Sequence, residues 1–287
     1  MNDADRWAAR VLKANNQSIT YRLYQNPEVT NGRRLVLLHG AGVAGIDTWS
    51  YIARMLDQWQ EILIPDLRGM GDTRALNHEE EAFSDEDLVA DLSALVDYLG
   101  WWMFDLGGYS MGGMVAMLYK QKYASRVGKQ FLLESALLDR PTWDATVEIR
   151  QKYSEATQYL RGNDKEVGIL AFMNTISPNR RISPQVEALS MSRLGHRPVG
   201  FANALDCVTA TINKVDRPSL IAAQGDVTSF IGGLSVDAMH QYHQYLDNSL
   251  PNWHYFKVPG TDHSLPYQKP RSIAKTMNAE AFRFYTS

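Results

Sequence analysis

A serine between glycines is the feature of this sequence with the clearest chemical meaning. It lies in Gly108-Tyr109-Ser110-Met111-Gly112, which has the pattern G-x-S-x-G. An apolar run at 103–106 precedes the pattern, and residues 113–119 after it are typical of a helix. A sharp turn from strand to helix would strain the serine backbone and expose its hydroxyl. Ser110 is therefore the candidate nucleophile.

A serine hydroxyl is a weak nucleophile, so it needs a base, which is most often a histidine oriented by a carboxylate. Among seven histidines, His263 is the best candidate, because it lies in a loop just after the apolar run at 255–258. His240 and His243 have a spacing that could bind a metal on a helix, but no third ligand accompanies them. We therefore expect a catalytic histidine at 263 and no metal site.

Two carboxylates compete to orient His263. Asp226 follows an expected strand at 219–223, and Glu134 ends an expected strand at 131–133. Both lie between Ser110 and His263 in the sequence, so either could hold the imidazole in the required tautomer. We prefer Asp226 and keep Glu134 as the alternative.

An acyl-transfer enzyme also needs two N–H groups that stabilise an oxyanion. The Met111 N–H is expected at the N-terminus of the helix that follows Ser110. The second candidate is the Ala41 N–H, in His39-Gly40-Ala41-Gly42, where small residues allow the backbone to approach a substrate. The glycine-rich patterns of phosphate-binding loops are not present in this segment.

The overall composition is that of an ordinary globular protein, with 45% hydrophobic and 21% charged residues. A net charge of −3 gives no reason to expect a nucleic-acid or membrane partner. No segment has the roughly 18 apolar residues of a membrane span, and residues 1–6 are not followed by the apolar run of a secretory signal. Cys207 is the single cysteine, which excludes an internal disulfide. We expect a cytoplasmic monomer or homodimer that acts on a small molecule.

Short apolar runs alternate with helical patterns, which predicts an α/β fold with a mostly parallel sheet and helices on both faces. The expected strands are 20–24, 35–38, 62–64, 103–106, 131–133, 219–223 and 255–258.

The segment 136–214 instead has a purely helical pattern, with helices expected at 142–160, 164–176, 183–194 and 198–212. We interpret it as a cap over the carboxyl edge of the sheet, inserted between two core segments, 1–135 and 215–287. Ligands bind at that edge in open α/β sheets. Trp143, Phe172 and Phe201 are the candidate substrate contacts from the cap.

Four segments in this order resemble the motifs of the α/β-hydrolase superfamily. They are Leu37-Leu38-His39-Gly40, the segment Asp66 to Thr73, Gly108 to Gly113, and Pro259-Gly260-Thr261-Asp262-His263. The resemblance covers nearly the whole chain. It implies an eight-stranded sheet, a helical cap after the sixth strand, and a cofactor-free serine hydrolase of the esterase and lipase type.

The sequence departs from the family pattern around the acid. Gly225 directly precedes Asp226, whereas the family's acid segment usually has its glycine three residues before the aspartate. Glu134 lies where the haloalkane dehalogenase and coelenterazine luciferase branch has its acid. That branch has an aspartate nucleophile, so Ser110 argues against dehalogenation and against epoxide hydrolysis.

The function that these residues favour is hydrolysis of a small to medium carboxylic ester, thioester or lactone by acyl transfer. Three alternatives remain open. One is hydrolysis of a C–C bond, and another is a non-hydrolytic enzyme of the same fold, such as a lyase, perhydrolase or cofactor-free dioxygenase. The third is a small-molecule receptor. We expect the cap to determine substrate specificity, and its sequence does not identify a substrate.

Overall fold

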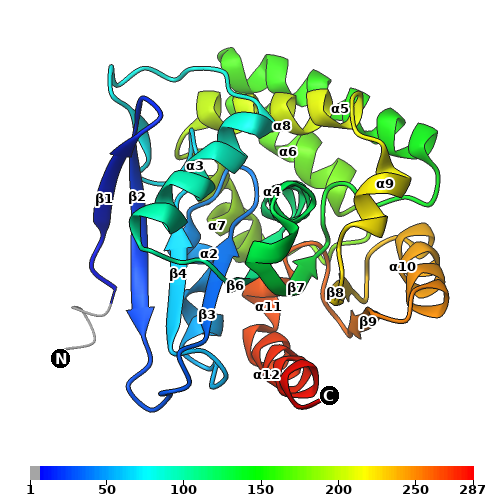
Figure 1. The fold of residues 1–287 in the computed structure, drawn as a ribbon. Coiled ribbons are helices and arrows are strands. Elements are labelled where there is room, and N and C mark those ends of the chain that lie inside the picture. Colours follow the sequence, from blue (N-terminus) through cyan, green and yellow to red (C-terminus); the bar gives the residue numbers. More distant parts are fainter. Residues whose placement is uncertain (1–6) are drawn as a thin grey trace.

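A computed structural model describes residues 7–287. Residues 1–6, on which the expectation about a secretory signal rests, lie outside the described part. The strands form one sheet in the order β1-β2-β4-β3-β6-β7-β8-β9, with the short β5 paired to β2 (Figure 1). Their bounds are β1 Arg10–Ala14, β2 Gln17–Gln25, β3 Arg34–Leu38, β4 Glu61–Pro65, β5 Arg74–Ala75, β6 Phe104–Tyr109, β7 Val127–Leu133, β8 Val227–Gly232 and β9 Trp253–Val258.

The sheet is mostly parallel, as the sequence predicts. Strand β2 pairs antiparallel with β1 and β4, whereas every pairing from β4 through β3, β6, β7 and β8 to β9 is parallel. Besides the two-residue β5, the sheet has the eight strands that the family resemblance implies, and six of the seven strands expected from the sequence are among them. Because the parallel strands run in one direction, their carboxyl ends meet at one edge of the sheet.

Helices cover both faces of the sheet. The helices are α2 Gly45–Ala53, α3 Asp85–Tyr98, α4 Met111–Lys122, α5 Trp143–Arg161, α6 Lys165–Ile176, α7 Pro184–Leu194, α8 Pro198–Ile212, α9 Arg217–Ala222, α10 Asp237–Ser249, α11 Leu265–Gln268 and α12 Pro270–Thr286, with a short 3-10 helix, η1, at Ala124–Arg126. Successive side chains of β3 point to opposite faces of the sheet and pack against different helices. Val36 and Leu38 pack with residues of α3 and α4, whereas Leu35 and Leu37 pack with residues of α2 and α12.

The helical insertion lies between β7 and β8 and has an apolar core of its own. Helices α5, α6 and α8 contribute Tyr153, Phe172 and Phe201 to this core. In Figure 1 these helices run above the rest of the fold. The four expected cap helices are confirmed, each within one residue of its predicted bounds.

The strand expected at 219–223 is wrong, because this segment belongs to helix α9. Pro218 lies in the first turn of α9, where a proline has no hydrogen bond to lose and its fixed φ favours the helix. A short apolar run does not distinguish a strand from a buried helical turn. The strand is β8, which begins at Val227. Asp226 therefore precedes a strand rather than following one.

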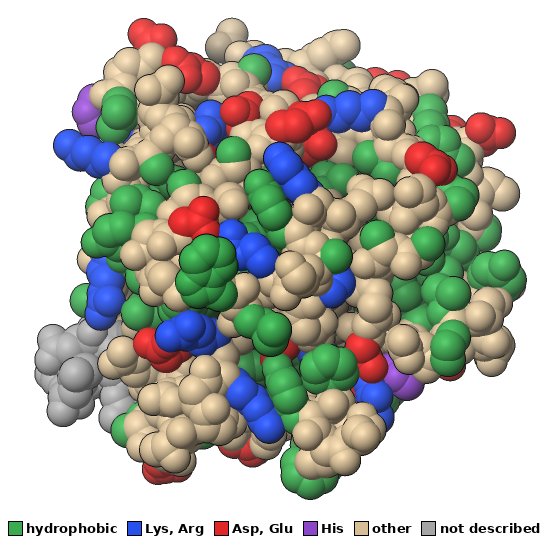
Figure 2. Space-filling model, in the orientation of Figure 1, with side chains coloured by type: hydrophobic (Ala, Val, Ile, Leu, Met, Phe, Trp, Pro, Cys, Tyr) green, Lys and Arg blue, Asp and Glu red, His purple; other side chains and the backbone are tan. Residues whose placement is uncertain are grey.

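On the face in Figure 2, acidic and basic side chains are interspersed. Within the described part of the chain, no helix is both long enough and apolar enough to cross a membrane.

Candidate active site

Ser110 occupies the turn between β6 and α4 with a strained backbone, at φ 53° and ψ −115°. At this turn, neighbouring backbone segments pack so closely against Gly108 and Gly112 that neither position has room for a side chain. A Cβ added at Gly108 would lie 2.3 Å from the Gly112 carbonyl oxygen, and one added at Gly112 would lie 2.4 Å from that of Leu38. Only glycine fits at both positions. The strain of Ser110 is therefore imposed by the surrounding fold, as is common for functional residues.

The loop after β3 lies against this turn. A Cβ added at Gly40 would lie 3.0 Å from the ring of Tyr109 and 3.3 Å from the Ser110 Cβ. Ala41, the next residue, lines the same cavity as Ser110. Met111 is the first residue of α4, so its N–H has no acceptor within the helix. The structure thus brings Ala41 and Met111, the two expected oxyanion-hole residues, to one small cavity that Ser110 also lines.

His263 lies in the loop between β9 and α11 and lines the same cavity. Its Nδ1 is 2.7 Å from Oε2 of Glu134, and both side chains are buried. An ionised carboxylate only accepts hydrogen bonds, so this contact assigns the ring proton to Nδ1 and leaves Nε2 as the basic nitrogen. The ring of Tyr109 packs beside the imidazole, with centroids 5.1 Å apart.

Glu134 is held by several donors at once. Its Oε1 accepts hydrogen bonds from the Gly232 N–H at 2.7 Å and from the Ser235 hydroxyl at 2.5 Å. Burial alone would raise the pKa of Glu134, but the interaction with His263 and the bonds from Ser235 and Gly232 outweigh burial and lower the pKa. The carboxyl group is therefore ionised at neutral pH. Glu134 also has a positive φ of 43°, so its backbone is strained like that of Ser110.

The expected contact between Asp226 and His263 is not formed, which corrects our preferred acid. Asp226 lies at the amino end of β8, at the opposite edge of the sheet from His263. There it pairs with Lys129 and, at 2.9 Å, with Arg283. The error follows from the false strand at 219–223, which would have placed Asp226 at the carboxyl edge. The alternative residue, Glu134, makes the contact instead.

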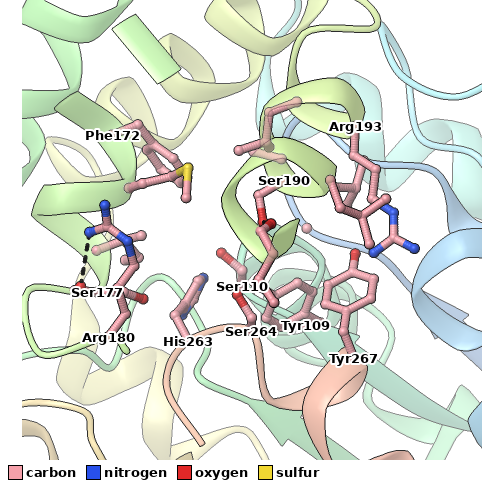
Figure 3. A pocket seen from close by; sticks show the side chains of 18 of the residues that line it. Tyr109, Ser110, Phe172, Ser177, Arg180, Ser190, Arg193, His263, Ser264 and Tyr267 are labelled. Atoms are coloured by element: carbon pink, nitrogen blue, oxygen red, sulfur yellow. Dashed lines mark hydrogen bonds between the residues drawn. The ribbon is translucent and has the colours of Figure 1, made fainter. Parts of the chain in front are cut away.

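A cavity of about 350 Å³ opens beside Ser110 and His263 (Figure 3). Core residues form one side of it, and cap helices α6 and α7 form the other. The cap contributes mostly apolar side chains, namely Phe172, Met173, Ile176, Val186, Leu189 and Leu194. Such a lining, with a few polar groups, is typical of a site for a small organic ligand.

Comparison with known proteins shows the family of the chain. The family model described as alpha/beta hydrolase fold matches residues 33–177, which is half of the chain. This protein belongs to the α/β-hydrolase superfamily. A curated relative, the "Putative 2-succinyl-6-hydroxy-2,4-cyclohexadiene-1-carboxylate synthase" of Bacillus subtilis, is 24% identical over 256 residues, covering 85% of this chain and 88% of its own.

Two solved structures illustrate the shared fold. A carboxylesterase from Nitrososphaera gargenis has a TM-score of 0.76 at 17% identity, covering 96% of this chain and 99% of its own. MenH from S. aureus also has a TM-score of 0.76 at 17% identity, covering 92% and 98%. At this level of identity, the likeness concerns the fold alone.

The three aromatic residues expected in the pocket of this α/β-hydrolase differ in their positions. Phe172 lines the cavity. Phe201 packs edge-on against Phe172 in the cap core, 5.1 Å away, and does not line the cavity. Trp143 also lies away from it, with the guanidinium of Arg217 over its ring. A helical pattern shows that a side chain is buried, but it does not show which neighbour covers it.

The polar part of the lining includes residues that no sequence motif marks. Arg180 and Arg193 from the cap and Tyr267 from α11 all line the cavity. No local pattern distinguished these arginines from the many exposed ones. Within residues 7–287, no group of three or more His, Cys, Asp or Glu side chains is placed to hold a metal ion. His240 instead contacts the Tyr255 hydroxyl, and His243 contacts the Leu138 carbonyl.

Proposed function

We propose that this protein is a serine hydrolase that cleaves a small to medium carboxylic ester, thioester or lactone by acyl transfer. Ser110 is the nucleophile, His263 the general base, and Glu134 the residue that orients His263. The contact that carries the proposal is the 2.7 Å hydrogen bond between Glu134 and His263 beside the strained Ser110. It supports a triad whose three members come from separate segments of the chain.

The proposed reaction has two steps. The Ser110 Oγ attacks the carbonyl carbon while Nε2 of His263 takes the hydroxyl proton, which it then gives to the leaving alcohol. The N–H groups of Ala41 and Met111 bind the oxygen that becomes negative. Water, deprotonated by the same imidazole, then attacks the acyl-enzyme and releases the acid. Glu134 stabilises the imidazolium in both steps.

The first experiment combines a covalent probe with substrate turnover. The purified protein is treated with a fluorophosphonate and analysed by intact mass, and it is assayed with p-nitrophenyl esters from acetate to decanoate. We expect one adduct on Ser110 and turnover with an optimum chain length. Ser110→Ala should abolish the adduct and lower kcat by about a million-fold.

Ser125→Ala is the matched control, because Ser125 is an exposed serine in η1, remote from the cavity. This variant should retain both labelling and turnover. Near-normal ester hydrolysis by Ser110→Ala would contradict the proposal.

A second candidate is a non-hydrolytic enzyme that uses the same three residues. The curated relative that matches 85% of this chain is named as a synthase rather than a hydrolase. In that case, Ser110 would be labelled by the fluorophosphonate while the ester series would not be turned over. The same experiment therefore separates the two candidates.

A further inference from the structure

The charged side chains that line the candidate substrate cavity are all positive. Two arginines line the cavity, Arg180 and Arg193, and none of its lining residues is an aspartate or glutamate. Figure 3 shows Ser110 and His263 in the middle of the lining, with Arg180 toward one end and Arg193 toward the other. A cation inside a largely apolar cavity attracts an anion more strongly than it would on an open surface, because less water screens it.

The two arginines differ in how their charge is balanced. Arg180 is paired with Glu187, at 2.9 Å, and both residues belong to the cap. The guanidinium of Arg193 lies 4.9 Å from the centre of the Tyr267 ring. Among residues 7–287, no carboxylate forms an ion pair with Arg193. Its five N–H donors are thus available to a ligand.

Three other polar side chains of the lining are already hydrogen bonded. The Tyr267 hydroxyl is hydrogen bonded to Thr48 at 2.9 Å, and the Ser190 hydroxyl donates to a backbone carbonyl of its own helix. The Gln268 side chain both donates to and accepts from Asp262. The Ser177 and Ser264 hydroxyls also line the cavity but carry no charge. The guanidinium of Arg193 is therefore the unpaired charged group of this lining.

The other arginines of a neighbouring cavity form ion pairs, in contrast to Arg193. That cavity, of about 300 Å³, shares Arg193 and Val43 with the first one. Its other arginines are paired, Arg22 with Asp66 and Arg197 with Glu80. Arg193 therefore differs from the arginines around it, and it lies on the wall of the cavity that contains Ser110.

We propose that Arg193 binds a carboxylate of the substrate, so that the enzyme prefers esters that carry a negative charge away from the scissile bond. A planar guanidinium matches the two oxygens of a carboxylate, and the guanidinium carbon of Arg193 lies over the ring of Tyr267. This inference rests on the proposed hydrolase function and names a substrate class for it.

The test compares two substrates that differ in one charged group. They are mono-p-nitrophenyl adipate and its neutral adipamate analogue, in which an amide replaces the free carboxylate. We expect the wild-type kcat/KM to favour the adipate by about 10- to 100-fold, as for a hydrogen bond to a charged group. Arg193→Gln should bring the ratio near one by losing activity on the adipate alone, and Arg193→Lys should keep part of the preference.

Two further variants locate the effect. Arg181→Gln is the matched control, because Arg181 is an exposed arginine of the cap that does not line the cavity. It should keep the wild-type ratio. Arg180→Gln should keep most of the preference, because Glu187 already balances its charge. A wild-type ratio of one or less, an unchanged ratio in Arg193→Gln, or loss of the preference only in Arg180→Gln would overturn the assignment.

A binding measurement keeps this test separate from the test of hydrolysis. Calorimetry compares N-propyl adipamate, a stable anion, with the neutral N-propyl adipamide. Tighter binding of the anion to wild type, lost in Arg193→Gln, would support the carboxylate site even if no ester is hydrolysed. Equal affinity for both compounds, or binding of neither, would overturn it while ester hydrolysis could still stand.

Discussion

Glu134 and Asp226 are two carboxylates that flank neighbouring parallel strands, at opposite edges of the sheet. Glu134 follows the carboxyl end of β7 and contacts a histidine, a hydroxyl and a backbone N–H. Asp226 precedes the amino end of β8 and pairs with Lys129 and Arg283. Both carboxylates are well satisfied by hydrogen bonds. Their partners differ in kind, and that difference separates a residue suited to chemistry from one suited to stability.

The partners determine what each carboxylate can do. An imidazole can accept a proton during a reaction, so the negative charge of Glu134 can stabilise the imidazolium that would form on His263. Asp226 instead pairs with two cations. The side chain of Lys129 is fully buried, and burial lowers its pKa, which the hydrogen bond and charge of Asp226 oppose. Removing Asp226 would leave that buried cation with weaker compensation. In addition, ligands bind at the carboxyl edge of such sheets, where Glu134 lies.

The largest predicted effect is a difference in kcat between the two variants in which one carboxylate is replaced by its amide. Glu134→Gln should lower kcat for an activated ester by about 1,000- to 10,000-fold, because the amide no longer fixes the tautomer of His263 or stabilises its cation. Asp226→Asn should change kcat by less than about 3-fold, since Asp226 does not reach the site. Initial rates at saturating substrate measure both effects. A larger loss in Asp226→Asn would reverse the comparison.

For the free energy of unfolding, we expect the opposite order, with a larger loss in Asp226→Asn than in Glu134→Gln. Asp226→Asn should lower the free energy of unfolding by about 3 kcal/mol, as expected when one partner of a buried ion pair is removed. The retained contact between Lys129 and Glu280, at 3.8 Å, limits the loss. Urea unfolding followed by circular dichroism measures the change. A variant as stable as wild type would show that Asp226 has no structural role.

The hydroxyl of Ser235 gives a finer test of the Glu134 environment. Ser235→Ala removes one of the hydrogen bonds to Oε1 and leaves those from Gly232 and His263 in place. We expect about a 10-fold decrease in kcat with little change in KM, since a hydrogen bond to a charged group is worth about 1.5 kcal/mol or more. A change in KM alone would indicate that the loop moved into the pocket.

The residues that the sequence placed together in the candidate site were recognised from local patterns. The glycines around Ser110 and the loop containing His263 are short motifs, and the contacts that they require lie mostly within a few residues or on adjacent strands. The sheet and the cap helices follow from periodicity over longer segments. Each of these features can be recognised without knowing the tertiary structure.

The choice of acid depended on a distinction that periodicity does not make. Residues 219–223 fit a buried strand and a buried helical turn equally well, and that one assignment moved Asp226 from one edge of the sheet to the other. The position of Arg193 depends similarly on how the cap packs over the core. Such long-range contacts are set by packing, and a single sequence does not reveal them.

The smallest predicted effect is a change of stability with pH. The pKa of Glu134 is lowered in the folded protein from its ordinary value of 4.5. Its ionised form therefore stabilises the fold above about pH 4.5, and this contribution is lost as the pH falls through the lower folded-state pKa. The stability deficit of Glu134→Gln relative to wild type should thus be largest at neutral pH and smaller at pH 3. Urea midpoints of both proteins across this range test the sign, because the other carboxyl groups are common to both. A deficit that grows toward low pH would mean that Glu134 is held protonated in the fold, and a protonated acid would not stabilise the cation on His263.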